Sequence, residues 1–380
     1  MIEFQKIYKG YKEKKSVLCD VNLTVKTNEF LVLIGSSGCG KTTLLKMVNK
    51  LNTIDRGDIL LDGISVKNIQ DNELRRKIGY VVQDGGLFPH LTISENINIL
   101  LKITRMPEAD RYHRINELLH MVDLDPDSYR NLYPSQLSGG QRQRVGVARA
   151  FATDPDLILM DEPFSALDPV TRTELQDEIC KLHKLHKKTI IFVTHDMEEA
   201  IKLADRICII QNGHIIQCDT PENILKHPKN DYVEEFIGKN KLWSNPEFIK
   251  AEDIMKLNPI RISRHRTVLQ ACHIMNYYSI NSVLVTNQNV LEGVVLLSDI
   301  CNSPASTPVS EYISYNYISV FNNTSLKKII NTIDCNISGI IPVIDHEKHL
   351  LGYLSNSILL ATISKQYEEK DTVNEAGGTI

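Results

Sequence analysis

Short, uninterrupted apolar runs recur along the first 237 residues and are separated by segments with helical spacing. The most continuous of these runs lie at residues 30–34, 80–82, 157–160, 190–194 and 207–210. A strand that is buried on both faces has this continuous pattern, whereas a half-exposed strand alternates. We therefore predict an α/β domain with a mostly parallel core sheet, covering helices and an antiparallel β portion near the N-terminus.

Two local patterns add detail to this domain. The Asn-Gly pair at residues 212–213 lies between two apolar runs and predicts a tight hairpin. Between residues 91 and 136 no apolar strand pattern occurs, and RINELLHMVDL at residues 114–124 has helical spacing. We expect a helical subdomain over about residues 91–150, inside a domain that spans residues 1–237.

A second domain is indicated by a change of composition and by a weak internal repeat. After residues 238–250, which we interpret as a linker, similar segments recur with a period of about 58 residues. Each copy, at residues 251–305 and 306–365, has the pattern of a helix, an extended segment, a helix and two strands. The two copies are predicted to pair into one small α+β domain. Residues 366–380 are polar and locally acidic, and we expect them to be disordered.

Composition narrows the function classes. The 380 residues are 42% hydrophobic and 24% charged, with a formal net charge of −4, which argues against broad electrostatic attraction to nucleic acid. The eight cysteines form no C-x-x-C pair, which fits a reducing compartment better than a disulfide framework or a zinc site. No apolar stretch approaches the roughly 20 residues needed to span a bilayer. We therefore expect any membrane association to come through a partner.

A glycine-rich motif indicates a nucleotide site. GSSGCGKT at residues 35–42 follows an apolar run, precedes a helical segment and matches the phosphate loop G-x-x-x-x-G-K-[ST]. Gly35, Gly38 and Gly40 leave the backbone N–H groups free to face a phosphate, and the helix N-terminus adds positive partial charge. We expect Lys41 to bridge the β- and γ-phosphates and the Thr42 hydroxyl to bind Mg²⁺.

Polar residues directly after three apolar runs are candidates for the chemistry. Asp161 is expected to hold Mg²⁺, and Glu162 is expected to polarise a water for attack on the γ-phosphate. His195 is expected to contact the γ-phosphate, although a lone histidine is more often structural. Gln83 is open to three interpretations: a Mg²⁺ ligand, a contact to the attacking water, or a structural residue.

Together with LSGGQ at residues 137–141, these residues resemble the ATPase subunit of an ATP-binding cassette (ABC) transporter. The resemblance implies that ATP contacts the phosphate loop and an N-terminal aromatic side chain, namely Tyr11 (or Tyr8), Gly35, Ser36, Ser37, Gly38, Cys39, Gly40, Lys41, Thr42 and Thr43. It implies that a signature motif acts on the ATP of a second copy through Ser138, Gly139, Gly140 and Gln141, and that a D-loop consists of Ser165, Ala166, Leu167 and Asp168. Catalysis is assigned to Glu162, His195 and Gln83, and Mg²⁺ binding to Thr42, Gln83 and Asp161.

The signature segment also has a local interpretation. Ser138 to Gln141 spells a capping box, S-x-x-Q, which by itself starts a helix. Glycine costs about 1 kcal/mol per helical position relative to alanine, so Gly139 and Gly140 are a poor choice for stability alone. The pair leaves N–H groups unobstructed at a helix N-terminus, which is an anion site. Beside a complete phosphate loop that site is redundant within one chain, and it gains a use across a head-to-tail dimer.

The repeat at residues 251–365 resembles a tandem pair of CBS (cystathionine-β-synthase) modules. Among ABC importers, this extension is similar to that of the osmoprotectant group, which takes up glycine betaine, carnitine, choline or proline betaine. The resemblance implies a homodimer with permease subunits and an extracytoplasmic substrate-binding protein, at the cytoplasmic face of the membrane and without nucleic acid. Two alternatives remain: an importer ATPase for another small solute such as an amino acid, or a soluble regulatory or nucleic-acid-linked ABC ATPase.

In that group the CBS pair senses ionic strength or binds a regulatory adenine nucleotide, cyclic di-AMP in several members. The family's nucleotide-contact pattern, G-h-h-[TS]-x-x-D, is incomplete in both copies here. The first copy keeps Asp299 but has Leu296 at the hydroxyl position, and the second keeps Ser355 but has Ile358 in place of the acid. Cyclic di-AMP binding and a purely structural dimerisation role therefore both stay open.

Overall fold

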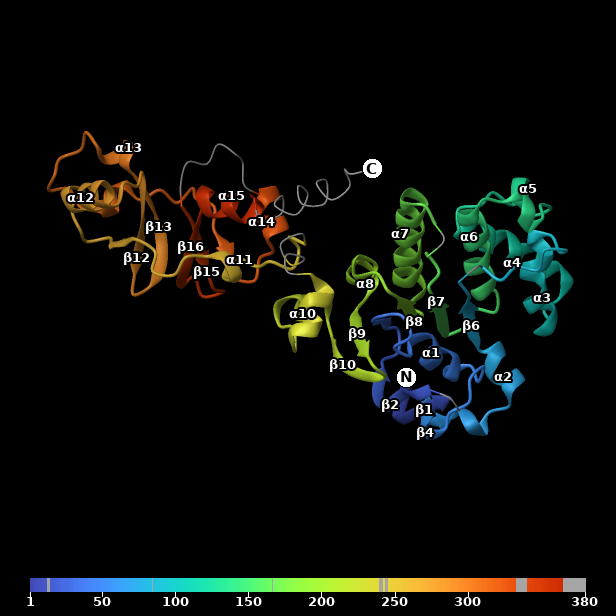
Figure 1. The fold of residues 1–380 in the computed structure, drawn as a ribbon. Coiled ribbons are helices and arrows are strands. Elements are labelled where there is room, and N and C mark those ends of the chain that lie inside the picture. The colour runs from blue at the N-terminus through green and yellow to red at the C-terminus, as the bar shows by residue number, and fades with distance from the viewer. Residues whose placement is uncertain are drawn as a thin grey trace, which may run out of the picture. The chain divides into compact units, whose positions relative to one another are not determined.

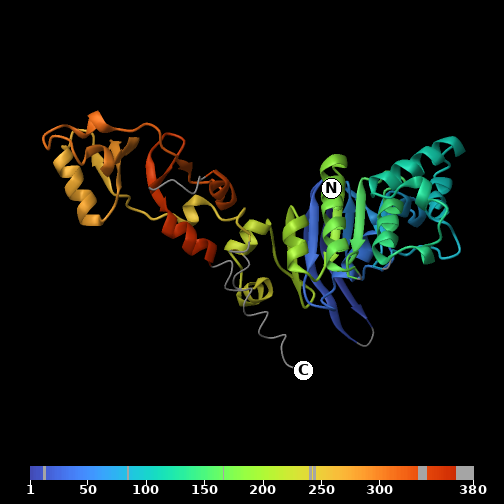
Figure 2. The same cartoon turned by 90° about the horizontal axis from the view of Figure 1, so that it is seen from above.

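The computed structural model describes residues 1–11, 14–83, 85–165, 167–238, 242, 245–332 and 340–364 (Figures 1 and 2). The chain divides into two compact units, Met1–Ile237 and Gly238–Ile380. Within the described residues, no helix combines the length and the apolar character that crossing a membrane requires. The expected disordered tail at residues 366–380 lies outside the described residues.

The described part of the first unit forms two sheets. One is antiparallel, with the order β2-β1-β4-β5, and contains β1 (Ile2–Tyr11), β2 (Lys14–Val25), β4 (Arg56–Leu61) and β5 (Ile64–Ser65). The other has the order β10-β9-β3-β8-β7-β6 and contains β3 (Phe30–Ile34), β6 (Ile78–Val81), β7 (Leu157–Asp161), β8 (Thr189–Thr194), β9 (Arg206–Gln211) and β10 (His214–Asp219). Every neighbouring pair from β9 to β6 is parallel, and β10 is antiparallel to β9.

The apolar runs form the central strands because both faces of the larger sheet are covered. Every residue of β3, β7 and β8 is buried, as their continuous patterns predicted. At the edge of the sheet, Asn212 and Gly213 join β9 to β10 with φ values of 48° and 81°. Two successive positive φ values are the geometry of a two-residue hairpin turn. The predicted parallel core, antiparallel N-terminal portion and hairpin are all confirmed.

A group of helices forms a subdomain between β6 and β7 in the chain. It is the teal part of Figure 1 and contains α3 (Ile93–Ile103), α4 (Glu108–Met121), α5 (Pro126–Tyr129), η2 (Pro134–Gln136) and α6 (Gly139–Ala150). Thr92 is the N-cap of α3 and forms a capping box with Glu95, whose carboxylate accepts a hydrogen bond from the Thr92 N–H. The prediction of a helical subdomain is confirmed.

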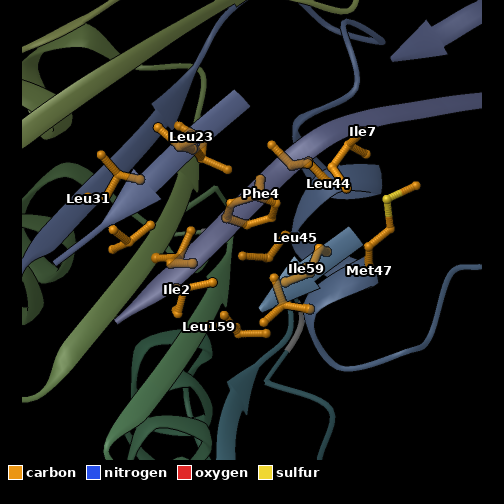
Figure 3. Packing of buried hydrophobic residues seen from close by; sticks show 14 of the residues in the cluster. Ile2, Phe4, Ile7, Leu23, Leu31, Leu44, Leu45, Met47, Ile59 and Leu159 are labelled. Carbon is orange, nitrogen blue, oxygen red and sulfur yellow. The ribbon is translucent and has the colours of Figure 1, made fainter. Parts of the chain in front are cut away.

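The remaining helices of the first unit cover the sheets or follow them. They are α1 (Lys41–Val48), η1 (Val66–Asn68), α2 (Asp71–Arg76), α7 (Pro169–His186), α8 (Met197–Leu203), α9 (Pro221–Lys226) and α10 (Asp231–Ile237). Helix α1 packs into a core shared by both sheets (Figure 3). In that core, Leu44 and Leu45 of α1 lie among Phe4, Ile59 and Leu159, all fully or almost fully buried. The helix that begins at the phosphate loop is thus held by two sheets.

The described part of the second unit contains two similar three-stranded sheets. Their strands are β11 (Arg261–Ser263), β12 (Ser282–Asn287) and β13 (Val290–Leu296), and β14 (Val320–Phe321), β15 (Ile340–Ile344) and β16 (Leu350–Ser355). In each sheet the first pair is parallel and the second antiparallel. Its helices are α11 (Ala251–Ile254), α12 (Val268–Tyr278), α13 (Leu297–Ile300), η3 (Val309–Tyr312), α14 (Leu326–Thr332) and α15 (Asn356–Ser364).

The two copies share contacts, so they form one domain as predicted. The N–H of Leu291 donates to the Lys348 carbonyl at 3.0 Å, and the N–H of Leu350 donates to the Asn289 carbonyl at 2.9 Å. A core that includes Leu291, Leu350 and Ile344 spans both sheets. Burial of apolar side chains from both copies makes the pair one folding unit.

Candidate functional site

The phosphate loop joins β3 to α1, and at Gly35 and Gly40 it is packed too closely for side chains. Gly40 lies at the start of α1 with φ 106°, and Gly38 has φ 76°, so both occupy a region that L-residues rarely adopt. A Cβ on Gly40 would lie 2.6 Å from a Leu18 methyl carbon, and one on Gly35 would lie 2.1 Å from the Ile210 carbonyl oxygen. Neighbouring strands therefore hold the loop in place, and its shape requires glycine.

The Lys41 side chain is buried and folds back onto the backbone of this loop. Its Nζ donates to the carbonyl oxygens of Gly35 at 2.7 Å and Ser36 at 3.0 Å. The first turn of α1 carries no acidic residue. A buried ammonium that contacts only neutral acceptors, next to a helix N-terminus, favours binding of an anion. The arrangement therefore fits a phosphate chain.

A hydroxyl and a carboxylate meet beside the loop. The Thr42 Oγ1 donates to the Asp161 Oδ1 at 2.7 Å, and the Lys46 Nζ lies 3.4 Å from the Asp161 Oδ2. These oxygens are the kind of ligand that Mg²⁺ prefers. Within the described residues no group of three or more His, Cys, Asp or Glu side chains could hold a metal alone. The residues fit a Mg²⁺ whose shell is completed by phosphate oxygens and water, as is common for this ion.

Burial also affects a tyrosine next to this carboxylate. The Tyr80 hydroxyl of β6 is buried, and its pKa is raised well above the usual value, first by burial and then by the nearby charge of Asp161. The phenol therefore stays neutral over the whole physiological range. It therefore adds no second negative charge beside Asp161.

Glu162 and His195 approach each other where β7 and β8 end. Glu162 has φ 45°, and its N–H donates to the Val193 carbonyl at 3.0 Å. A positive φ is uncommon for a residue other than glycine and is often found at functional sites. The Glu162 Oε2 lies 3.4 Å from the His195 Nδ1, and both side chains are partly exposed. A carboxylate that can accept a proton thus lies beside an imidazole at the sheet edge.

Gln83 is connected to Glu162 through the segment that follows β7. The Gln83 Nε2 donates to the Ser165 Oγ at 3.2 Å, and the Ser165 Oγ donates to the Glu162 carbonyl at 3.0 Å. Strands β8, β7 and β6 are neighbours and parallel, so their carboxyl ends meet at one edge. The structure therefore brings Gln83, Asp161, Glu162 and His195 to the same edge of the sheet. The Ser165 link was not predicted from the sequence.

The signature motif begins α6 with the predicted capping box. The Ser138 Oγ accepts from the Gln141 N–H at 3.2 Å, and the Gln141 Oε1 accepts from the Ser138 N–H at 2.9 Å. Gly139 is exposed, whereas a Cβ on Gly140 would lie 2.2 Å from the Thr171 Cγ2. Gly140 therefore has a packing role against α7 that the sequence did not reveal, in addition to leaving its N–H group unobstructed.

A largely buried arginine on the signature helix forms ion pairs with one largely buried and two exposed carboxylates, which sequence reasoning missed. The Arg144 guanidinium lies 2.8 Å from Glu178 and 3.3 Å from Glu174, both on α7, and 3.8 Å from Asp123. Burial raises the pKa of Glu178 to about 7, although the nearby Arg144 opposes that rise. No local sequence pattern could have indicated this network, because its members lie on elements that are far apart in the chain.

The other predicted site residues are placed as follows. Asp168 caps α7 by accepting from the Thr171 N–H at 3.1 Å, and the bonds from Thr171 lower its pKa. Leu167 is buried, and Ala166 lies outside the described residues. The Tyr11 side chain is also outside them, so its choice over Tyr8 stays a prediction. Of the loop residues, Ser36 and Ser37 are exposed, Cys39 is buried and Thr43 is half-buried.

Comparison with known proteins agrees with this geometry. Residues 18–165 match the family model for the ABC transporter, and residues 251–306 and 309–365 match that for the CBS domain. The chain is 44% identical over 365 residues to the choline transport ATP-binding protein OpuBA of Bacillus subtilis, with 95% of each chain covered. The chain belongs to the ABC transporter family. The resemblances to an ABC ATPase and to tandem CBS modules are confirmed.

Other ABC relatives share the whole architecture. The chain is 44% identical over 363 residues to the glycine betaine/carnitine/choline transport ATP-binding protein OpuCA of Bacillus subtilis, covering 95% of each. It is 42% identical over 363 residues to the carnitine transport ATP-binding protein OpuCA of Listeria monocytogenes, covering 95% of this chain and 91% of that protein. These alignments extend across both units of this ABC protein.

A solved structure supports the fold of the ABC ATPase unit. The ATP-binding cassette MJ0796, solved as a dimer in a post-hydrolysis state bound to ADP and Pi, is 35% identical to this chain, with a TM-score of 0.54. The match covers 58% of this chain and 99% of that one. The first unit thus has the fold of an ABC ATPase.

Proposed function

We propose that this chain is the ATP-hydrolysing subunit of an importer for quaternary-amine osmoprotectants such as glycine betaine, carnitine and choline. One observation carries the proposal. The Thr42–Asp161 and Glu162–His195 pairs lie at one sheet edge beside a phosphate loop, in a chain 44% identical over 95% of its length to ATP-binding proteins of choline and glycine betaine/carnitine/choline transport.

In this proposal the phosphate loop binds the triphosphate. The N–H groups at the start of α1 and the Lys41 ammonium bind the β- and γ-phosphates. Thr42 and Asp161 hold Mg²⁺, which when bound neutralises charge on the phosphates. Because loop and helix are packed between two sheets, these groups are positioned before the substrate binds, which phosphoryl transfer requires.

Glu162 takes the role of the base. Its carboxylate accepts a proton from the attacking water. His195 orients that carboxylate through Nδ1, which leaves Nε2 available to contact the γ-phosphate. Hydrogen bonds from Gln83 to Ser165 and from Ser165 to the Glu162 carbonyl connect the segment after β6 to the backbone of Glu162. A displacement of that segment would therefore move the Glu162 backbone.

The signature motif acts on the ATP of a second copy. Helices α1 and α6 both begin with backbone N–H groups that can face an anion, and α1 has Lys41, Thr42 and Asp161 beside its N-terminus. We place Ser138, Gly139 and Gly140 over the γ-phosphate held by Lys41 of the other copy. The dimeric state of the similar cassette MJ0796 supports this arrangement.

A groove near Gln83 is the proposed docking site for a permease. A cavity of about 570 Å³ lies between α2, β6 and the helical subdomain, with Phe88 and Ile103 at its wall, 46% and 43% exposed. Arg149 also lines it and donates to the Gly86 and Gly85 carbonyls at 2.7 and 3.0 Å. An apolar helix end seated in the groove would contact the segment that carries Gln83. Permease movement and hydrolysis are coupled through this segment.

The CBS unit is the proposed regulatory part, with cyclic di-AMP as the ligand to test. The second copy supports this, because the Ser355 Oγ accepts from the Ile358 N–H at 3.4 Å at the start of α15 and leaves a hydroxyl at the nucleotide-contact position. In the first copy, Leu296 starts α13 without any side-chain cap. Titration of the full chain with cyclic di-AMP, by calorimetry, should show binding that Ser355→Ala weakens. Absence of binding at tens of micromolar ligand would leave a structural role for the CBS pair.

The transport proposal is tested by uptake. Cells that carry the permease, the binding protein and this subunit are given labelled glycine betaine, carnitine and choline at low and high osmolarity. Uptake of at least one solute should require this subunit and be lost with Glu162→Gln. It should persist with Glu117→Gln, which alters an exposed carboxylate of α4 in the same way. Full uptake with Glu162→Gln, or none with the wild type, would contradict the proposal.

A further inference from the structure

Two cysteines face each other across the hairpin strands β9 and β10. Cys208 and Cys218 are register partners in this antiparallel pair, and both are free thiols. Directly opposed residues of antiparallel strands point to the same face, with their Cα atoms about 4.5–5.5 Å apart. That separation lies within the range that a disulfide accepts. The backbone therefore already has the spacing for a bond between the two sulfurs.

The two thiols have different surroundings. Cys208 is fully buried, whereas Cys218 is partly exposed and its Sγ lies 3.0 Å from the Arg206 Nη2. The hydrogen bond from Cys208 and the charge of Arg206 lower the pKa of Cys218, against burial and the charges of Glu29 and Asp219. The same hydrogen bond and burial raise the pKa of Cys208. Cys218 is thus the partly exposed thiol whose pKa is lowered, and Cys208 beside it is a buried thiol whose pKa is raised.

Arg206 is held in position by a second partner. Its Nη1 lies 3.0 Å from the Glu29 Oε1, and it also donates to the Thr24 carbonyl at 3.2 Å. The guanidinium therefore stays next to Cys218 instead of moving into solvent. Another buried cysteine, Cys39 in the phosphate loop, has a pKa that burial raises, which makes it a poorer nucleophile than Cys218.

We propose that Cys218 and Cys208 form a thiol-oxidation site, in which Cys218 reacts with a hydroperoxide and Cys208 converts the product into an intramolecular disulfide. This inference does not depend on the transport function. The Cys218 thiolate attacks the hydroperoxide and breaks its O–O bond, giving a sulfenic acid and an alkoxide. The alkoxide takes up the proton that the thiol released and leaves as an alcohol. Cys208 then attacks the sulfenic sulfur, the S–S bond forms, and water leaves with the Cys208 proton.

The site lies on the hairpin that supports the phosphate loop. Ile210, two residues after Cys208, places its carbonyl oxygen against Gly35. The Gly213 carbonyl at the hairpin turn accepts from the Cys19 N–H at 2.9 Å. A disulfide between Cys208 and Cys218 would link β9 to β10 farther from the hairpin turn than either contact. Oxidation at this site is therefore transmitted directly to the strand that backs the nucleotide-binding loop.

Peptide mapping of the full, reduced chain tests the proposal. After limiting hydrogen peroxide and blocking of free thiols, cleavage behind Arg206 and Lys226 leaves both cysteines in one peptide, residues 207–226. The disulfide then appears as an unblocked peptide that is lighter by two hydrogen atoms and takes up two blocking groups after reduction. Cys208→Ser keeps a hydroxyl donor beside Cys218, so it should trap a sulfenic acid there that dimedone labels. Cys218→Ser should leave Cys208 reduced.

The exposed Cys301 of the second unit provides the matched control. Cys301→Ser should leave formation of the disulfide peptide unchanged. In the wild type at neutral pH, oxidation of Cys218 should be at least about tenfold faster than that of Cys301, because thiolate character sets the rate. Oxidation of Cys301 or Cys39 ahead of Cys218, or oxidised Cys218 without the disulfide peptide, would overturn the proposal.

Discussion

Gly40 directly precedes helix α1 and Gly139 is the first residue of helix α6, and the two N-termini differ in what surrounds them. Helix α1 follows the phosphate loop and α6 follows the signature motif, and neither has an acidic residue in its first turn. At α1 no side chain caps the helix, and Lys41, Thr42 and Asp161 converge beside it. At α6, Ser138 and Gln141 cap each other. The same helix-terminus physics thus has a lysine, a hydroxyl and a carboxylate beside it at α1, and only a reciprocal cap at α6.

The glycines of the two motifs are required for different reasons. Gly40 has a positive φ and no room for a Cβ, so backbone shape and packing both demand glycine. The Ser138 backbone is in the ordinary β-region, and Gly140 instead makes room for Thr171 of α7. The phosphate loop is therefore specified by its own conformation, and the signature motif by what packs against it.

The largest expected effect concerns Glu162, the proposed base at the sheet edge beside the phosphate loop. Glu162→Gln should lower phosphate release by about 10²–10⁴-fold, because a general base contributes an effect of that size. ATP binding should be kept, since Lys41 and Thr42 are untouched. Single-turnover hydrolysis and calorimetric ATP binding measure the two quantities, with Glu117→Gln as the control. Hydrolysis within a few-fold of the wild type would exclude Glu162 as the base.

Loss of the ion pair between α6 and α7 should strongly lower the free energy of unfolding. At pH 8, above the Glu178 pKa of about 7, Arg144→Met leaves a largely buried carboxylate without its cation, and removing one partner of such a pair costs about 3 kcal/mol of unfolding free energy. Urea denaturation measures this quantity. Lys184→Met changes an exposed cation of α7 and should stay within about 0.5 kcal/mol of the wild type. An equal loss in both variants would show that the network has no special role.

Glu178 should make the free energy of unfolding depend on pH. Its folded-state pKa of about 7 exceeds the usual 4.5, so the folded state binds this proton more tightly than the unfolded state. The resulting stabilisation is full below pH 4.5 and is lost as the pH rises toward 7. The difference in unfolding free energy between the wild type and Glu178→Gln should shift by about 2 kcal/mol across this window. A parallel pH dependence in both proteins would contradict the raised pKa.

The smallest effect in this series tests whether α6 serves another copy. Asp is as good an N-cap as Ser, so Ser138→Asp should fold normally while placing a negative charge where the phosphate would bind. ATPase activity should fall by at least about tenfold. Lys41→Ala is inactive for a different reason, since it lacks its own phosphate contact.

A mixture of the two variants tests whether the signature motif of one copy completes the phosphate-loop site of another. In a mixed pair, one site combines an intact phosphate loop with an intact signature motif, so an equal mixture should recover about a quarter of the wild-type sites. Steady-state ATPase assays of each variant and of the mixture measure this recovery. If the mixture is no more active than its components, the signature motif does not complete a site across two copies.

Much of the fold and of the nucleotide site could be predicted from the sequence because the signals are local. Continuous apolar runs identified β3, β7 and β8, and Asn212–Gly213 identified the hairpin. The spacing of the phosphate loop placed Lys41 and Thr42, and the internal repeat indicated the CBS domain. Backbone shape, burial of a strand and helix capping are decided by residues within a few positions of one another.

Only the tertiary structure revealed the links between distant segments. The bond from Gln83 to Ser165, the pairing of Arg144 with Glu178, and the opposition of Cys208 and Cys218 join side chains from different strands and helices. Each depends on strand order, register and helix packing, which no short sequence window encodes. The sequence by itself thus indicated the candidate groups for nucleotide binding. The fold decided which of them meet, because proximity in space is set by packing.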